Sequence, residues 1–225
     1  MHPMMEELTM KRIERTIEGL RRNRMEAVYA KDRTEARELL KSYLNPGCSI
    51  GCGGSVTLDE IDALSLFRCG DYRFFDRYAA GLTADEVKTV YHNALSADVY
   101  VMSSNAVTEN GELYNVDGRG NRVAALIYGP ERVVVVVGYN KIVNSIDDAI
   151  LRVKTVAAPA NAARLHCKTP CAHTGRCISL DKQHAPALCE GCETEARICA
   201  SYVVSGYQRE ANRIKVIIVG ESLGF

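Results

Sequence analysis

A polar segment in the middle of the chain carries the side chains best suited to bind and transform a small substrate. It runs from Val99 to Arg122 and reads VYVMSSNAVTENGELYNVDGRGNR. Its first four residues form a short β-prone run, which is typical of a buried strand. The serines, asparagine, threonine and glutamate that follow would lie at the carboxyl end of this strand, where open α/β sheets bind ligands. The segment therefore predicts a polar binding site at that end of a sheet.

The second half of this segment predicts a hairpin and then a loop suited to anions. Asn110-Gly111 tolerates the positive φ angles of a tight turn, so residues 112–116 would fold back on the residues before the turn. The loop 117–122 adds two glycines, which let the backbone approach a ligand, and two arginines, which suit carboxylate or phosphate. An ordinary hairpin and loop is the alternative, because turns are rich in Asn, Gly and Asp in any protein.

A glycine-rich stretch, residues 51–55, lies between a predicted strand and a predicted helix that Thr57 and Glu60 would cap. Backbone N–H groups exposed at such a junction bind phosphate or carboxylate. The stretch matches neither a Walker A nor a complete Rossmann pattern, so a tight packing turn stays open as the alternative.

These segments together predict one site, with Glu109 or Asp117 as the general acid or base. Asp117 as a cap of its own loop is the alternative role. Lys141 follows the predicted strand 132–138 and is a candidate cation at the same sheet edge. The candidate residues for binding the substrate or its anionic group are Gly53, Gly54, Ser55, Thr57, Asn105, Thr108, Asn121, Arg122 and Lys141.

A second chemical feature is a cluster of cysteines near the C-terminus. Six of the nine cysteines fall within residues 167–199, whereas ordinary core usage would scatter them, and three histidines fall within residues 166–199. Thiolates suit an iron–sulfur cluster or zinc, and we favour [4Fe–4S] with zinc as the alternative. Redox-active thiols without metal are a third interpretation. The candidate metal ligands are Cys171, Cys177, Cys189, Cys192 and Cys199.

Composition narrows the class of protein. The 225 residues contain 28 basic and 28 acidic side chains, so no global charge favours nucleic acid or an anionic membrane. No apolar run approaches the length of a membrane span, and residues 1–9 lack the apolar core of a signal peptide, so we expect a cytoplasmic protein. Nine cysteines in such a protein indicate metal or redox chemistry rather than structural disulfides.

The elements that must position these groups alternate between strands and helices. Helical periodicity covers residues 4–30, and a second helix would run from Asp32 to Leu44. Five consecutive valines within residues 132–138 are typical of a strand buried on both faces of a parallel sheet. Apolar strands are expected again at 201–205 and 214–219. The pattern predicts a single domain over residues 1–225, a three-layer α/β/α fold with a mostly parallel sheet, N-terminal helices and a cysteine-rich insertion at 166–199.

Three segments resemble one known family. GCGGSVTLDEI, SNAVTENGELYNVDGRGNRVAALIYGP and VVVVVGYNKIV are similar to the lactate-utilization (LUD) domain family, from about Met10 to the end of the chain. The resemblance implies a fold like the superfamily of glucosamine-phosphate deaminase, ribose-phosphate isomerase and coenzyme A transferase. In that superfamily the glycine loop contacts an anion. A Ser-Glu-Asn-Gly motif carries the nucleophilic glutamate of the transferases, and Thr108-Glu109-Asn110-Gly111 resembles it with Thr in place of Ser.

The cysteines also resemble a series found in clostridial-type single-domain LUD proteins. Thr169-Pro170-Cys171, Thr174-Gly175-Arg176-Cys177 and Arg197-Ile198-Cys199 match that series. A longer stretch, residues 178–188, departs from it, so either Cys177 or Cys189 could be the second ligand of a four-cysteine set.

Three functions follow from the residues and the resemblance. The first is a subunit of an iron–sulfur-dependent system that oxidises L-lactate to pyruvate with iron–sulfur partner subunits. The second is a stand-alone transferase-like or isomerase-like enzyme on a small anionic substrate, phosphorylated or of the coenzyme A type, with Glu109 as nucleophile or base. The third is a non-catalytic module that senses a small acid or redox state. Neither nucleic acid nor a membrane span is expected, and a homo-oligomer stays open.

Overall fold

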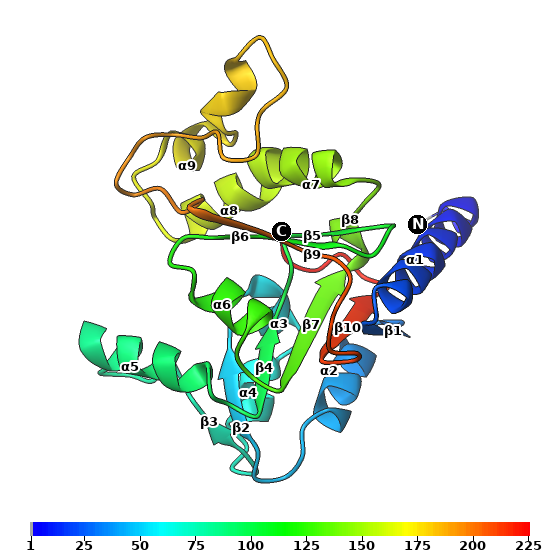
Figure 1. The fold of residues 1–225 in the computed structure, drawn as a ribbon, viewed down its shortest axis with the longest axis vertical. Coiled ribbons are helices and arrows are strands. Elements are labelled where there is room, and N and C mark those ends of the chain that lie inside the picture. Colours follow the sequence, from blue (N-terminus) through cyan, green and yellow to red (C-terminus); the bar gives the residue numbers. More distant parts are fainter. Residues whose placement is uncertain (1) are drawn as a thin grey trace.

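The computed structural model describes residues 2–225, and a sheet of six parallel strands forms its centre (Figure 1). The strand order is β1-β10-β7-β4-β2-β3, and every neighbouring pair is parallel. The strands are β1 (Glu26–Ala30), β2 (Ser49–Cys52), β3 (Arg73–Phe74), β4 (Val99–Met102), β7 (Arg132–Gly138) and β10 (Ile214–Val219). All carboxyl ends therefore meet at one edge of the sheet, as the sequence predicts for a ligand site.

Helices cover both faces of this main sheet, as the burial of the five consecutive valines of β7 on alternate faces shows. Val133, Val135 and Val137 belong to one apolar cluster, which α1 and α6 cover. Val134 and Val136 face the opposite cluster, which α2, α3 and α4 cover, and all five valines are fully buried. The helices are α1 (Pro3–Arg22), α2 (Arg33–Ser42), α3 (Val56–Glu60), α4 (Ala63–Phe67), α5 (Ala84–Ala94) and α6 (Asn121–Ile127). The predicted mixed α/β architecture with a mostly parallel sheet and helices on both faces is confirmed.

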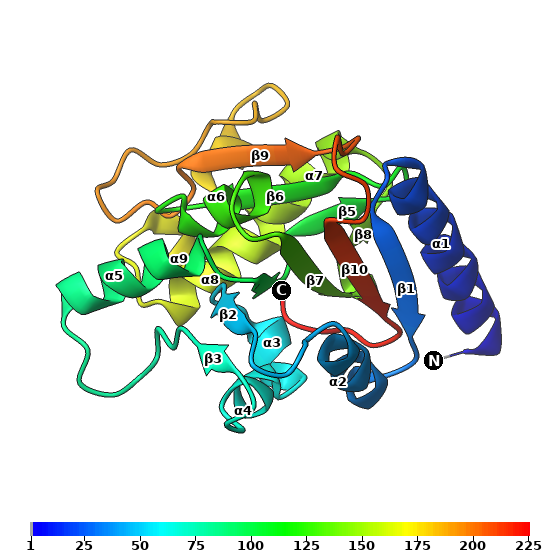
Figure 2. The same cartoon turned by 60° about the horizontal axis from the view of Figure 1, so that its bottom comes forward.

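A second, smaller sheet stands across the carboxyl edge of the first (Figure 1), and Figure 2 shows its longer strands running side by side. Its order is β8-β5-β6-β9, with β5 and β6 forming the predicted hairpin. These strands are β5 (Ala106–Thr108), β6 (Leu113–Asp117), β8 (Ile142–Val143) and β9 (Ser201–Ser205). The helices α7 (Ile146–Arg152) and α8 (Ala158–Arg164), joined by a π-helical turn at Val153–Ala157, pack on it. Pro159 has no N–H for a helical hydrogen bond, which is a physical reason for the irregular turn before it.

Two local predictions are wrong. The first helix ends at Arg22, and residues 26–30 form β1 instead. Arg24 has a φ of 62°, which stops the helix, and parallel pairing with β10 outweighs the helical periodicity that includes Val28. The glycine stretch does lead from a strand to a helix, but Ser55 rather than Thr57 caps it by accepting a hydrogen bond from Leu58 N–H.

The cysteine-rich segment lies on the far side of the second sheet from the main sheet (Figure 1). It contains α9 (Pro170–Thr174) and a 3₁₀ turn at Ile178–Asp181, and otherwise has no regular secondary structure until β9 begins. Within residues 2–225, no helix combines the length and the apolar character needed to cross a membrane.

Candidate functional site

A polar cavity of about 450 Å³ lies between the carboxyl edge of the main sheet and the second sheet. Residues after β2, β4 and β7 line it on one side, and residues from β6 and α8 line it on the other. The structure brings most of the predicted substrate residues together here. The predicted residues that line the cavity are Gly54, Ser55, Thr57, Asn105, Asp117, Asn121, Arg122 and Lys141.

Among the groups that line this cavity, Lys141 is the best suited to acid–base chemistry. It follows β7 on a 3₁₀ turn, Tyr139–Lys141, and only 3% of it is exposed. Its Nζ donates hydrogen bonds to Thr57 Oγ1 at 2.8 Å and to Ser103 Oγ at 3.0 Å, and no carboxylate is among its described hydrogen-bond partners. Burial, reinforced by the positive charges of Arg152 and Arg122, lowers the pKa of Lys141 to about 7. The amine can therefore both accept and donate a proton near neutral pH.

Arg122 also lines the cavity, but the protein already uses its hydrogen-bond donors. Its guanidinium donates to the carbonyls of Ser103 and Val116 and to the side-chain oxygens of Asn105 and Asn115. A Cβ on Gly53 would lie 2.9 Å from the Arg122 side chain, so the glycine lets this arginine pass. Arg122 thus ties the end of β4 to β6, and its Nε also lies 3.7 Å from Asp117 Oδ2, so the protein already engages its charge as well as its hydrogen bonds.

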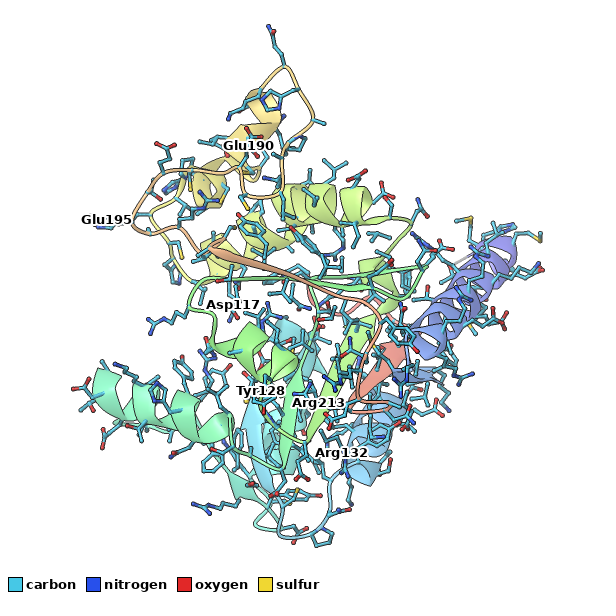
Figure 3. All side chains as sticks on the ribbon, viewed as in Figure 1. Asp117, Tyr128, Arg132, Glu190, Glu195 and Arg213 are labelled. Carbon is cyan, nitrogen blue, oxygen red and sulfur yellow. The ribbon has the colours of Figure 1, made fainter. Side chains whose placement is uncertain are left out.

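Asp117 ends β6 and caps the start of α6. Its Oδ1 accepts hydrogen bonds from the backbone N–H groups of Arg119 and Gly120 at 3.0 and 2.9 Å. Its Oδ2 accepts from the N–H groups of Arg122 and Val123 at 3.2 and 3.3 Å. The carboxylate therefore acts as the loop cap that was the alternative to general acid or base. Figure 3 shows its position between the main sheet and the cysteine-rich segment.

Three cationic residues of the cavity were not among the predicted site residues. Arg77, Arg119 and Arg164 line it, from the loop after β3, the loop before α6 and the end of α8. Arg77 stacks on Tyr91, with its guanidinium carbon 4.8 Å from the ring centre. Asp117 is the one acidic side chain among the described lining residues, against five basic ones, so the cavity favours an anion. No sequence spacing links these three arginines, since separate elements carry them.

Three predicted residues lie outside the cavity. Gly53 and Thr108 do not line it, and Glu109 points toward α1 instead. Glu109 accepts hydrogen bonds from Arg12 Nε at 2.8 Å and Arg15 Nε at 2.7 Å. Burial would raise the pKa of Glu109, but these two guanidinium groups outweigh it and hold the pKa below its ordinary value. The structure does not bring Glu109 to the other site residues, and its nucleophilic role stays a prediction.

The cysteines line a second cavity, of about 30 Å³, which lies between the cysteine-rich segment and the α7–α8 region. Four of the five predicted metal ligands line it: Cys171, Cys177, Cys192 and Cys199. Burial, together with the three neighbouring thiols, raises the pKa of Cys199 to about 11. All nine cysteines are free thiols, and Cys189 is exposed and outside the cavity.

The two cavities are neighbours. Ile198 lines both, and the consecutive residues Ala157 and Ala158 line the polar cavity and the cysteine cavity respectively. The basic cavity and the cavity lined by four thiols therefore share part of their walls.

The profile of the LUD domain family matches residues 13–219. This chain belongs to the LUD domain family. Among solved structures, it is similar to a DUF162 family protein from Deinococcus radiodurans, with 16% identity over 96% of this chain and 98% of that chain and a TM-score of 0.49. No curated protein matches this LUD-domain chain.

Proposed function

We propose that this LUD-domain protein binds L-lactate in the polar cavity and serves as a subunit of an iron–sulfur-dependent system that oxidises lactate to pyruvate. The observation that supports it is the shared wall at Ile198 between the basic cavity and the four-thiol cavity. A carboxylate substrate and a redox centre would then lie close together, as electron transfer between them requires.

The residues of the polar cavity suit a 2-hydroxy acid. The basic lining attracts the carboxylate, with Arg77, Arg119 and Arg164 as cations whose charge is not balanced by an acid in the cavity. Lys141, neutral in part near pH 7, can take the hydroxyl proton of lactate, and Thr57 and Ser103 hold its Nζ in place.

Oxidation of lactate to pyruvate removes the hydroxyl proton, which Lys141 would take, and the Cα hydrogen with two electrons, which must pass to a redox acceptor of a partner subunit. The residues of the cysteine cavity fit an iron–sulfur cluster, because four free thiols, the ligands such a cluster takes, line it. Such a cluster, when bound, supplies one-electron transfer. Partner subunits with iron–sulfur centres are therefore part of the proposal, since they must accept the electrons that leave the substrate.

Calorimetric titration of the protein with L-lactate, pyruvate and acetate tests substrate binding. We expect saturable binding of lactate and pyruvate, and affinity weakened roughly 10- to 100-fold in Lys141→Met, the loss typical of one charge-assisted hydrogen bond. Lys88→Met, an exposed lysine on α5, is the matched control and should bind as the wild type does. Lactate binding that is equal in Lys141→Met and wild type would contradict the proposed site.

A second candidate function is favoured by the size of the cavity. About 450 Å³ is within the range of pockets for larger ligands, and lactate fills only a small part of it. A transferase-like or isomerase-like enzyme on a phosphorylated or coenzyme A-type substrate would use this space, with Lys141 as acid or base. The same titration with a sugar phosphate and with coenzyme A separates the two, because binding of these without binding of lactate favours the second.

A further inference from the structure

We propose that Cys171, Cys177, Cys192 and Cys199, and not Cys189, are the ligands of one [4Fe–4S] cluster. This inference deepens the proposed function and rests on it, because it decides which of the five candidate thiols would ligate the iron–sulfur centre.

The cavity itself selects these four among the cysteines of the segment. Cys171 lies on α9, Cys177 follows that helix, and Cys192 and Cys199 come from the irregular stretch before β9. All four line the same cavity, although the first and the last are 28 positions apart in sequence. Cys189 is exposed, and its backbone carbonyl rather than its thiol is held, by Arg197 Nη2 at 2.6 Å.

A cluster and a single zinc ion require different spacings of their four ligand sulfur atoms. A tetrahedral zinc site with Zn–S bonds of about 2.3 Å requires its sulfur atoms to lie about 3.8 Å apart. A cube of iron and sulfide places its four cysteine ligands at its corners, so they surround a space rather than one point.

Hydroxyl groups accompany three of the four thiols. Thr169 Oγ1 lies 3.4 Å from Cys171 Sγ, and Ser179 Oγ lies 3.2 Å from Cys177 Sγ. Thr194 Oγ1 lies 3.6 Å from Cys192 Sγ. In each case the partner is two residues away in sequence. Hydrogen bonds to the ligand sulfurs tune and stabilise an iron–sulfur centre. The described contacts of the Cys189 thiol include no such hydroxyl group.

The charge of the surroundings also fits an anionic cluster. Lys154 lines the cavity and is 5% exposed, and its Nζ donates to Ser179 Oγ and to the backbone carbonyl of Glu190. The Glu190 carboxylate instead pairs with Lys182 at 2.7 Å. Figure 3 shows Glu190 within the cysteine-rich segment. A buried cation without a carboxylate partner is costly. Four thiolates that ligate a cluster would supply the missing negative charge.

Arg197 adds a second cation and holds the ligand loop in shape. Its guanidinium donates to the carbonyls of Cys189, Cys192 and Cys199 and to Tyr202 Oη. The loop that carries two of the proposed ligands is therefore fixed by backbone contacts that do not involve the thiols, which leaves the thiols free to bind.

Anaerobic reconstitution of the full chain with ferrous iron and sulfide tests the assignment. Iron and sulfide content, the visible absorption band and the electron paramagnetic resonance spectrum after reduction are measured for the wild type and for Cys→Ser variants. We expect about four irons and about four sulfides per chain in the wild type. Cys189→Ser, from the same segment, is the matched control and should keep the cluster. Each of Cys171→Ser, Cys177→Ser, Cys192→Ser and Cys199→Ser should lose the [4Fe–4S] signature, entirely or by conversion to a three-iron form.

Folding of each variant is checked by circular dichroism of the metal-free proteins, which should match the metal-free wild type. If a single variant does not fold, thiol alkylation of the loaded wild type followed by mass spectrometry gives the same information, because Cys189 should react while the four ligands are protected. One zinc per chain without sulfide, disulfides among these thiols, or loss of the cluster in Cys189→Ser would overturn the assignment. A cluster with the expected ligands in a protein that does not bind lactate would leave the assignment standing and contradict the proposed function instead.

Discussion

Burial of Lys141 should lower the free energy of unfolding of the protein, by an amount that depends on pH. Its pKa falls from an ordinary value of 10.5 to about 7 on folding, which corresponds to roughly 5 kcal/mol of lost stabilisation of the charged form. Near pH 7 the unfolded chain carries this proton fully and the folded chain only in part, so most of the cost is present. As pH rises above the folded pKa, the unfolded state binds more protons than the folded state, and stability increases until the pKa of the unfolded chain is passed.

Replacement of Lys141 by methionine should therefore stabilise the protein near neutral pH. The gain is reduced by the two hydrogen bonds lost to Thr57 and Ser103, about 1 kcal/mol each. Their hydroxyls lie 3.5 Å apart and can partly bond each other. The net expectation is a Lys141→Met variant more stable by about 2 to 3 kcal/mol at pH 7.

Urea unfolding of Lys141→Met, of wild type and of the exposed control Lys88→Met at several pH values measures this. The advantage of Lys141→Met should shrink and then vanish between about pH 7 and about pH 10, because the wild type gains stability over that range. An advantage that is independent of pH, or a variant less stable than wild type at neutral pH, would show that Lys141 is not held with a lowered pKa. A gain in stability combined with lost ligand binding would instead identify Lys141 as a group retained for function.

Three further predictions concern other parts of the molecule. Glu109→Gln should lower the free energy of unfolding by about 1 kcal/mol, since its pairs with Arg12 and Arg15 are partly exposed; lost turnover at unchanged stability would instead support Glu109 as the nucleophile. Gly111→Ala should cost more than about 3 kcal/mol in urea unfolding, because φ is +88° and a Cβ would lie 2.1 Å from Gly19 C. Gly47→Ala, also at positive φ but with open space around it, should cost about 1 kcal/mol, and equal costs at the two glycines would refute the packing argument. Arg119→Gln should weaken carboxylate binding several-fold at low salt and less at high salt, as calorimetry at two ionic strengths would show; no change at either salt would exclude Arg119 from the site.

Short apolar runs and turn residues allowed much of the fold to be predicted. The valine run, the hairpin around Asn110-Gly111 and the strands 201–205 and 214–219 are where the sequence places them. The predictions depend on local patterns, so they hold where the local pattern and the long-range pairing agree. At residues 26–30 the two disagree, and pairing with β10 produces a strand where periodicity predicts a helix.

The second sheet could not be predicted from the sequence, for the same reason. β5, β6 and β9 read as strands or hairpin, but only tertiary contacts decide that they pair with one another rather than with the main sheet. That separation creates the polar cavity between the two sheets.

The candidate site was predictable by residue type but not by the state of each side chain. Lys141 and Asn105 were placed correctly at a carboxyl edge, because strand ends can be read from the sequence. Nothing in the sequence shows that the donors of Arg122 are already used by β4 and β6, or that Glu109 meets two arginines of α1. Arg77 reaches the cavity through the path of the chain after β3, which has no local signature.

The decisive experiment for the proposed function is calorimetric titration of the anaerobically purified, iron–sulfur-loaded protein with L-lactate. We expect saturable binding of one lactate per chain, weakened in Lys141→Met and unchanged in Lys88→Met. Absence of lactate binding in the loaded wild type, with a sugar phosphate or coenzyme A bound instead, would contradict it.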